Sequence, residues 1–284
     1  MMWQCGNYTL DLKSPKIMAV INVTENSFSD GGDFLDPWAA CRRIDEALNE
    51  GAHILDLGAE SSRPGAKKID DDLEWSRLKP ILNYACQQGV PVSVDTYKPQ
   101  TMKRALEAGA SIINDIKALS EPGALEILAN NSTTAGICLM HMIGNPQTMQ
   151  VSPHYESVSN EVKNFLQKRI ESCLKRGIKS SRIAIDPGIG FGKTLQHNLE
   201  IMDTIPHLTT LGYPVLIGAS RKSFLGVLAS QPEAKNRLAA SISAALFAIN
   251  QGAKIIRVHD VRATLDAVTV WQKLLGMKHV NTGS

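Results

Sequence analysis

The sequence predicts an α/β fold, specifically a (βα)8 TIM barrel with a short N-terminal hairpin extension. Eight short apolar runs of strand length alternate with amphipathic stretches of helix length, as in a parallel sheet. No GxGxxG turn follows any of these runs, which argues against an open dinucleotide-binding sheet. Four segments, GAHILDLG, GASIINDI, AGICLMHM and GAKIIRVHD, repeat a small residue, an apolar run and a polar residue. Repeated βα units of this kind favour the closed barrel.

The expected elements follow one another along the chain. A hairpin over 3–12 comes first and is expected to close the bottom of the barrel. The strands are expected at 16–21, 53–57, 90–94, 112–114, 136–140, 183–185, 214–217 and 253–258. The helical patterns between them include 37–49, 71–88, 100–108, 157–176, 198–208, 236–250 and 264–275. Because no linker interrupts this alternation, residues 1–284 are expected to form one domain.

The composition is that of a globular protein with a large core. Of the 284 residues, 43% are hydrophobic and 20% are charged. The net charge of +2 is too small and too dispersed to indicate a nucleic acid or an anionic membrane surface as a partner. The five cysteines lack the paired CxxC spacing of a zinc motif, which favours reduced thiols. With no signal-like segment and no run long enough to span a bilayer, we expect a cytoplasmic protein.

Every expected strand ends in a polar residue. In a (βα)8 barrel the carboxyl ends of the strands and the loops after them form the functional site. Taken singly, a polar residue at a strand end is as well explained by capping the next helix or starting a turn. Eight such ends converging on one rim favour a functional site, because uncompensated polar groups in a cleft are costly. The residues at these ends are Asn22, Asp56, Asp95, Asn114, Asp115, His141, Asp186, Ser220, Arg221, Lys222, Arg257, His259 and Asp260.

Two polar loops follow the first and second strands. Residues 22–32 end in two glycines and are expected to act as a lid, the alternative being an exposed turn. Residues 58–65 place hydroxyls and a guanidinium among Gly and Pro, which is typical of a loop that contacts anions.

The segment 186–193, DPGIGFGK, resembles a nucleotide-binding loop but has the wrong spacing. A Walker motif would need glycine at position 187, which is Pro187, and the glycines at 188, 190 and 192 do not form GxGxxG either. We interpret the segment as a close-packed loop that presents Phe191 as an aromatic wall beside Asp186. A flat ring would fit against this wall.

Charge divides the expected site into two sides. Lys222, Arg257 and His259 surround the ends of the last two strands, where barrels commonly bind phosphate. Asp95, Asn114 and Asp186 offer acceptors to a heterocycle with adjacent N–H donors. The sequence therefore predicts a site that holds a heterocycle on one side and a phosphate on the other.

These residues lie in motifs that resemble the bacterial dihydropteroate synthases over nearly the whole chain. The motifs are NVTENSFSDGG, DLGAESSRPG, SVDTYKP, INDIKALSEPG, LMHMIGNPQTMQ, DPGIGFGKT, GASRKS and RVHDV, in the order of that family. The resemblance implies condensation of 6-hydroxymethyl-7,8-dihydropterin pyrophosphate with p-aminobenzoate to 7,8-dihydropteroate and pyrophosphate, with Mg²⁺ as cofactor. It also implies a homodimer, competition by sulfonamides, and a pterin methylene cation formed before the arylamine attacks.

The resemblance assigns residues to each part of the site, with Lys222, Arg63 and Asp95 as the catalytic set. The pterin would be held by Asp95, Asn114, Met140, Asp186, Phe191, Gly218 and Lys222. The pyrophosphate would be held by Asn22, Arg63, Arg257 and His259, with Asn22 also the metal ligand. The p-aminobenzoate would be bordered by Ser62, Pro64, Phe191 and Ser220.

The chain departs from the family in the two loops. The family usually reads Thr-Pro-Asp where this chain has Thr24-Glu25-Asn26, and Gly-Glu-Ser-Thr-Arg where it has residues 59–63, so that Ala59 and Ser62 differ. Two other functions remain open at this point. A pterin-dependent methyltransferase barrel would share the Asp/Asn pocket but needs no pyrophosphate site. An inactive pterin- or folate-binding paralogue is favoured only by the departures in the first loop, at Glu25 and Asn26. The Ala/Ser-rich helix 238–249 could be a dimer face or could pack tightly on the barrel.

Overall fold

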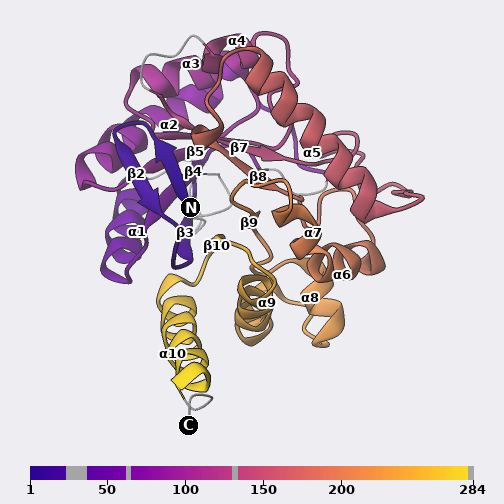
Figure 1. Cartoon of the computed structure of the whole chain (residues 1–284). Coiled ribbons are helices and arrows are strands. Elements are labelled where there is room, and N and C mark those ends of the chain that lie inside the picture. The colour runs from indigo at the N-terminus through magenta and orange to yellow at the C-terminus, as the bar shows by residue number, and fades with distance from the viewer. Residues whose placement is uncertain (24–36, 62–64, 130–133, 281–284) are drawn as a thin grey trace.

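The computed structural model describes residues 1–23, 37–61, 65–129 and 134–280, with the side chains of all of these except 37 and 277–280. Eight parallel strands form the barrel, in the order β8-β7-β6-β5-β4-β3-β10-β9 (Figure 1). A parallel bridge between Ile185 and Val215 joins the last strand of this order to the first. The strands are β3 (Lys16–Asn22), β4 (Ile54–Gly58), β5 (Val92–Asp95), β6 (Ile112–Asp115), β7 (Gly136–Met140), β8 (Ile183–Asp186), β9 (Leu216–Ile217) and β10 (Ile255–Val258). The predicted (βα)8 fold is confirmed.

Helices surround the barrel on its outside (Figure 1). The α-helices are α1 (Pro37–Asn49), α2 (Asp71–Ala85), α3 (Pro99–Glu107), α4 (Ala124–Ala129), α5 (Val158–Lys175), α6 (Leu195–Asp203), α7 (Ile205–Thr209), α8 (Ser223–Leu228), α9 (Leu238–Asn250) and α10 (Val261–Val280). Short 3-10 turns are η2 (Cys86–Gln88), η3 (Ser180–Arg182) and η4 (Ala234–Asn236). The strand residues that point outward pack against these helices in the main hydrophobic core, as Ile17, Leu55 and Ile113 do.

One expected helix is two. The pattern over 198–208 predicted a single helix, but α6 ends at Asp203 and α7 begins at Ile205. Pro206 explains the break, since proline lacks the N–H that a continuous helix would need and is accommodated in the first turn of a new helix instead.

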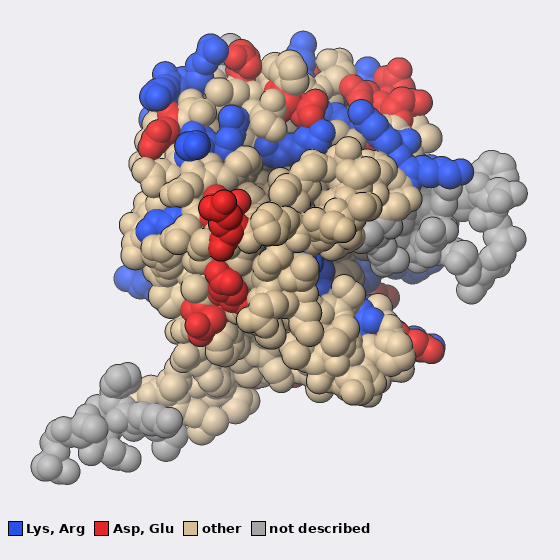
Figure 2. Space-filling view, turned by 90° about the vertical axis from the view of Figure 1, so that its right-hand side faces the viewer, with Lys and Arg blue, Asp and Glu red and all other residues tan. Residues whose placement is uncertain are grey.

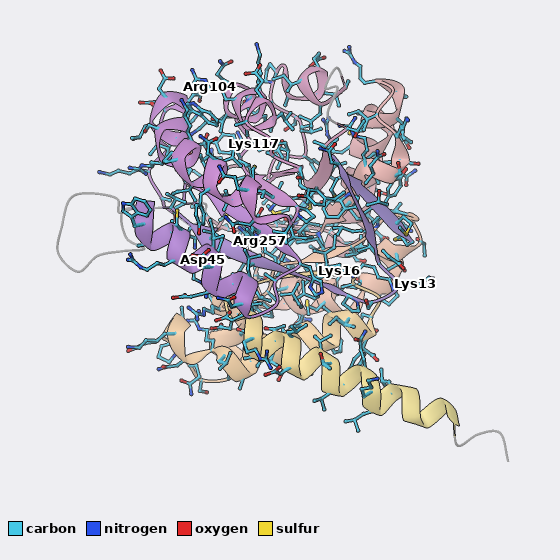
Figure 3. The ribbon with its side chains drawn as sticks, turned by 90° about the vertical axis from the view of Figure 1, so that its left-hand side faces the viewer. Lys13, Lys16, Asp45, Arg104, Lys117 and Arg257 are labelled. Atoms are coloured by element: carbon cyan, nitrogen blue, oxygen red, sulfur yellow. The ribbon has the colours of Figure 1, made fainter. Side chains whose placement is uncertain are left out.

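The predicted N-terminal hairpin closes the amino-terminal end of the barrel. Strands β1 (Met2–Cys5) and β2 (Tyr8–Asp11) pair antiparallel, and the Trp3 side chain is fully buried against the inward residues of the strands, including Met18 and Ile54. The Trp3 indole N–H donates to the Arg182 carbonyl oxygen at 2.9 Å. Lys13 and Lys16 lie at this end in Figure 3, whereas Arg257 lies nearer the middle of the molecule. The hairpin leaves the opposite, carboxyl end of the strands for a site.

The surface carries charges of both signs. Basic and acidic side chains are interspersed over the upper part of the face in Figure 2. Among the described residues, no helix is both long and apolar enough to cross a membrane.

Candidate active site

An ionic network joins four strand ends inside the mouth of the barrel. Arg257 of β10 donates through Nε to Asp56 Oδ2 of β4 at 2.6 Å and through Nη2 to Asp95 Oδ2 of β5 at 2.9 Å. Asn114 of β6 donates to the same Asp56 oxygen at 3.4 Å. Arg257 therefore crosses the mouth as a shared partner of two carboxylates, instead of standing alone as a cation.

Burial and charge set the protonation of this network. Burial raises the pKa of Asp95 to about 7, although the Arg257 guanidinium opposes the shift. Burial alone would lower the pKa of Arg257, but Asp56 and Asp95 together hold it above its usual value, so Arg257 stays charged. Asp56 Oδ1 and Asn114 Oδ1 are buried and accept no hydrogen bond. Unmatched buried acceptors are costly, which indicates that a ligand with donors completes this part of the site.

Asp186 ends β8 beside this network. Its Oδ1 accepts the Gly188 backbone N–H at 2.6 Å, and its side chain is nearly buried. Burial raises the pKa of Asp186, while the Gly188 hydrogen bond and the charges of Lys222, Lys193 and Arg257 lower it. Asp186 is thus a carboxylate surrounded by cations, suited to accept N–H groups from a polar ring.

The glycines after Asp186 shape the loop. Gly188, Gly190 and Gly192 all have positive φ values, of 71°, 78° and 60°. A Cβ at 188 would overlap the His141 carbonyl oxygen, and one at 192 would overlap the Ile143 side chain. Only glycine allows this tight passage, and the expectation of a close-packed loop is confirmed.

Phe191 and Lys222 face each other at the crest of this loop. The Lys222 ammonium lies 4.0 Å from the centre of the Phe191 ring and donates to the Ile189 carbonyl oxygen at 2.8 Å. Burial lowers the pKa of Lys222 to about 8, although the Asp186 charge opposes the shift. Phe191 also packs with an apolar cluster of Tyr97, Ile116 and Met140. Acceptors and an aromatic wall therefore lie together, as a flat heterocycle requires.

Ser220 and His259 form the opposite corner. Ser220 Oγ lies 3.0 Å from His259 Nδ1 and also accepts the His259 backbone N–H at 3.2 Å. Arg221 makes a bidentate pair with Asp260, at 3.0 Å and 2.5 Å, which ties the loop after β9 to the loop after β10. Gly218 leads into this corner, where an added Cβ would lie 3.8 Å from Arg257 Cβ and Cδ.

A buried salt bridge holds the beginning of the loop after β4. Glu60 pairs with Lys98, and the Tyr97 hydroxyl donates to Glu60 Oε1 at 3.0 Å. Lys98 also lies 3.6 Å from Glu74 of α2, which accepts hydrogen bonds from the hydroxyls of Thr96 and Thr101. All three ionic side chains are at most 8% exposed. These contacts therefore fix Glu60, the residue from which the chain continues to Ser62, Arg63 and Pro64.

The structure brings most of the residues predicted for the site to one end of the barrel. Asn22, Asp95, Asn114, Met140, Asp186, Phe191, Gly218, Ser220, Lys222, Arg257 and His259 all lie at the carboxyl ends of the strands or in the loops after them. Glu25, Asn26, Ser62, Arg63 and Pro64 lie outside the described residues. Tyr97 and Ile116, which share the apolar wall, were missed, although each stands within two residues of an identified strand end.

Asp115 has the capping role that was the alternative reading for every strand end. Its two oxygens accept the backbone N–H groups of Lys117 and Leu119, both at 2.7 Å. They support a turn in which Ala118 and Leu119 have positive φ values of 51° and 58°. Its neighbour Asn114 faces the barrel mouth.

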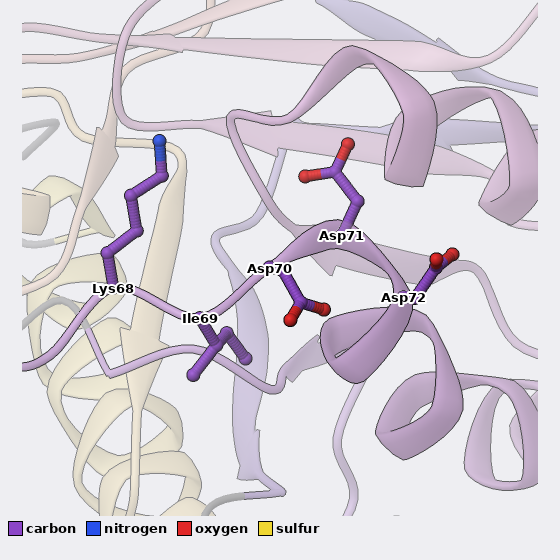
Figure 4. A pocket seen from close by; sticks show the side chains of 5 residues that line it. All are labelled: Lys68, Ile69, Asp70, Asp71 and Asp72. Carbon is purple, nitrogen blue, oxygen red and sulfur yellow. The ribbon is translucent and has the colours of Figure 1, made fainter.

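A separate pocket of about 560 Å³ lies at the start of α2. Its lining comes from one segment, in which Lys68 stands apart from Asp70, Asp71 and Asp72 (Figure 4). Asp70 caps α2, since it accepts the Leu73 N–H at 2.7 Å. None of the strand-end side chains lines this pocket, so we assign the site to the barrel mouth.

The comparison with known families assigns this (βα)8 barrel to the class of pterin-binding barrels. Residues 18–259 match the sequence profile of the family described as "Pterin binding enzyme". The dihydropteroate synthase of Neisseria meningitidis serogroup C is 46% identical over 276 residues, which cover 96% of this chain and 97% of that protein. This chain belongs to the dihydropteroate synthase family.

Solved structures agree with this assignment. The Xanthomonas albilineans dihydropteroate synthase with 4-aminobenzoic acid has a TM-score of 0.91 and 42% identity, covering 96% of this chain and 98% of that one. The Burkholderia cenocepacia dihydropteroate synthase complexed with 7,8-dihydropteroate has a TM-score of 0.90 and 39% identity, covering 99% and 98%.

Proposed function

We infer that this protein is a transferase of folate biosynthesis that joins 6-hydroxymethyl-7,8-dihydropterin pyrophosphate to p-aminobenzoate, giving 7,8-dihydropteroate and pyrophosphate. The observation that carries the inference is the set of acceptors at the ends of β5, β6 and β8, with Lys222 and Phe191 beside it. Family membership at 46% identity supports the same reaction.

We propose that the pterin enters among Asp95, Asn114 and Asp186. The unmatched Asn114 Oδ1 and the Asp186 carboxylate supply acceptors for the amino and ring N–H groups of a pterin. Met140 and Phe191 would cover its faces, Lys222 would donate to a ring acceptor, and Gly218 would border the ring.

The pyrophosphate would lie on the side of Asn22, Arg63, Arg257 and His259. The Nε and Nη2 groups of Arg257 donate to the two carboxylates. Its remaining Nη1 group would donate to a phosphate oxygen. The guanidinium groups of Arg63 and Arg257 would stabilise the charge that develops on the leaving pyrophosphate more strongly in the transition state than in the ground state.

Mg²⁺ fits this side through Asn22. Groups of three or more His, Cys, Asp or Glu that could hold a metal are absent from the described residues. Mg²⁺ commonly keeps waters and binds through one or two protein oxygens plus substrate phosphates, so a single amide oxygen at the end of β3 suits it. When bound, Mg²⁺ would neutralise charge on the pyrophosphate oxygens.

The protein's own residues mainly position the reactants. The bond between the pterin methylene and the pyrophosphate oxygen breaks, and its electron pair leaves with the pyrophosphate. The arylamine nitrogen then forms a bond to the methylene carbon and loses one proton. Asp95 and Asp186 would stabilise the cationic pterin by their negative charge, so no side-chain nucleophile is needed. Ser62, Pro64, Phe191 and Ser220 would border the arylamine.

The test is turnover by the purified protein. Pyrophosphate release and dihydropteroate formation are expected with both substrates and Mg²⁺, and a sulfonamide is expected to compete with p-aminobenzoate. Lys222→Met should lose most of this activity, whereas Lys175→Met, a change on the exposed side of α5, should keep it. No product from folded wild-type protein would refute the proposal.

Two alternatives are separated by the same assay. An inactive paralogue would bind pterin without turnover, and only the loop-one departures at Glu25 and Asn26 favour that outcome. A pterin-dependent methyltransferase would have no use for a pyrophosphate site, so the candidate phosphate contacts Arg63, Arg257, His259 and Lys222 weigh against it.

We also propose that the chain acts as a homodimer of single-domain subunits. Leu238 and Phe247 of α9 are 40% and 43% exposed, and Val270 and Leu274 of the adjoining α10 are both 58% exposed. An apolar surface on two adjoining helices favours pairing with a second copy. Sedimentation should give a dimer that Phe247→Glu weakens. Leu174→Glu on α5, at a residue of similar exposure (42%), should leave it unchanged. A monomeric wild type would refute the proposal.

A cytoplasmic location is our proposal as well. Cys5, Cys86, Cys138 and Cys173 are free thiols, which fits a reducing compartment.

A further inference from the structure

Lys193 has no role in the proposed reaction, yet it lies within the glycine-rich loop that forms part of the site. Its side chain points inward and is 3% exposed. The ammonium donates to the carbonyl oxygens of Gly188 and Phe191, both at 3.0 Å, and lies 3.1 Å from His141 Nδ1. An ammonium has three N–H donors, and the three acceptors use all of them. Lys193 therefore has no donor left for a phosphate.

His141 is the fixed member of this arrangement. Burial and the Lys193 charge lower the pKa of His141 to about 3, so the ring is neutral and its Nδ1 can accept a proton donor. The ring lies edge-on to Phe165, with ring centres 5.0 Å apart, and its backbone N–H donates to the Asp186 carbonyl oxygen at 2.9 Å. His141 thus anchors Lys193 to the ends of β7 and β8.

The loop that Lys193 binds carries two groups assigned to the pterin. Asp186 begins it and Phe191 forms its crest. Other contacts hold its outer side, since Asn198 accepts the Gly190 N–H at 2.7 Å and the Tyr155 hydroxyl donates to the Gly192 carbonyl oxygen at 2.8 Å. Lys193 supplies the hydrogen bonds on the inner side of the loop, one to the carbonyl oxygen of Gly188 and one to that of Phe191.

We propose that Lys193 is a positioning residue of the pterin site, which fixes the backbone of residues 186–193 through hydrogen bonds to two of its carbonyl oxygens, ties that backbone to His141, and places a positive charge behind Asp186. The inference rests on the proposed assignment of Asp186 and Phe191 to the pterin. It gives the lysine of this loop a task unlike that of the similar-looking lysine in a nucleotide-binding loop, because here the ammonium binds the protein's own backbone.

The charges around Lys193 agree with this role. Burial lowers the pKa of Lys193 to about 7, Asp186 opposes that shift, and Lys222 adds to it. The same Lys193 charge helps to lower the pKa of Asp186. Loss of the ammonium would therefore remove one hydrogen bond from each of two carbonyl oxygens, of which that of Gly188 would still accept the Phe191 N–H at 3.1 Å, and it would also weaken the carboxylate form of Asp186.

The first experiment compares Lys193→Met with Lys175→Met, a matched change on the surface of α5. Titration calorimetry with the pterin pyrophosphate should show at least a tenfold loss of affinity in Lys193→Met and none in Lys175→Met. The KM for p-aminobenzoate should change by a smaller factor than the pterin affinity, because Phe191 is the one proposed p-aminobenzoate contact that lies on this loop. In the same variant, NMR titration should show the His141 pKa rising from its low value.

A second pair of variants keeps the proposal testable if Lys193→Met does not fold. His141→Leu removes an acceptor and should weaken pterin binding, whereas His141→Gln keeps an acceptor oxygen and should bind nearly as wild type. Wild-type pterin affinity in folded Lys193→Met or His141→Leu would overturn the proposal, and loss of the fold in both would assign the pair to general stability and overturn it too. If wild-type protein itself bound no pterin, the proposed function would fail instead.

Discussion

Replacement of Asp186 by Asn tests the pterin assignment most directly, because it changes the charge of the residue and little else. The Gly188 N–H donates to Asp186 Oδ1 at 2.6 Å, and an asparagine oxygen can accept the same bond. The loop should therefore keep its shape. What the variant loses is the negative charge and the second acceptor oxygen, whose place an NH2 group takes.

The expected loss follows from the strength of the hydrogen bonds. Bonds to a charged acceptor contribute about 1.5–3 kcal/mol and neutral ones about 0.5–1.5 kcal/mol. Two ring donors that lose a charged partner should cost about 2–3 kcal/mol, which is about a 30- to 150-fold rise in the Kd of the pterin. Calorimetry with the pterin substrate measures this change, and circular dichroism checks the fold.

The pH dependence gives the same test a second readout. Burial raises the pKa of Asp186 above its ordinary value, so acidification should protonate it earlier than an exposed aspartate. Wild-type affinity for the pterin should fall as the pH drops through that raised pKa. This pH-dependent loss of affinity should be absent from Asp186→Asn. An affinity within threefold of wild type in the variant would refute the assignment of Asp186.

Three further predictions concern stability and backbone geometry. Trp3→Ala should lower the free energy of unfolding by about 3–5 kcal/mol in a denaturant titration. Its kcat should stay within twofold of wild type, because Trp3 lies at the end of the barrel opposite the site. A large loss of kcat in folded protein would argue against this separation of the hairpin from the site. Gly192→Ala should weaken pterin binding, because its φ of 60° disfavours a side chain and its Cβ would overlap Ile143; unchanged binding would contradict the need for glycine. Asp95 has a folded pKa of about 7 against 3.8 as its ordinary value, so its contribution to stability is lost as the pH rises from about 4 to 7. Urea titrations at pH 5 and 7.5 should show that the free energy of unfolding falls less with rising pH in Asp95→Asn than in the wild type. An equal fall in both proteins would contradict that pKa.

The strand-end residues were predictable because the βα repeat determines where each strand ends. Once GAHILDLG and GASIINDI are recognised as strands, Asp56 and Asn114 must lie on one rim. The close-packed loop after Asp186 was predictable for a similar reason, since three alternating glycines favour positive φ values. These inferences needed only local sequence and the symmetry of the barrel.

The pairing of the charges was not predictable, because it depends on how the barrel closes. Arg257 lies 201 residues from Asp56 and 162 from Asp95 in the sequence, and only the pairing of β10 with β3 and of β3 with β4 brings them together. Arg257, expected as a cation for phosphate, is therefore already bound to two carboxylates. The contacts of Lys193 were likewise not predictable, since nothing in the spacing of the segment 186–193 indicates that this side chain turns inward.

The N-terminal hairpin has a consequence for the order in which the molecule forms. Residues 1–12 are synthesised before the strands that they cover, since Trp3 donates to the carbonyl of Arg182, 179 residues later, and the hairpin also lies against Gly136 at the start of β7. The hairpin must therefore wait for strands made much later, with its indole uncovered in the meantime. We expect the end of the barrel opposite the site to be among the last parts to close during synthesis, after most βα units have already paired with their neighbours.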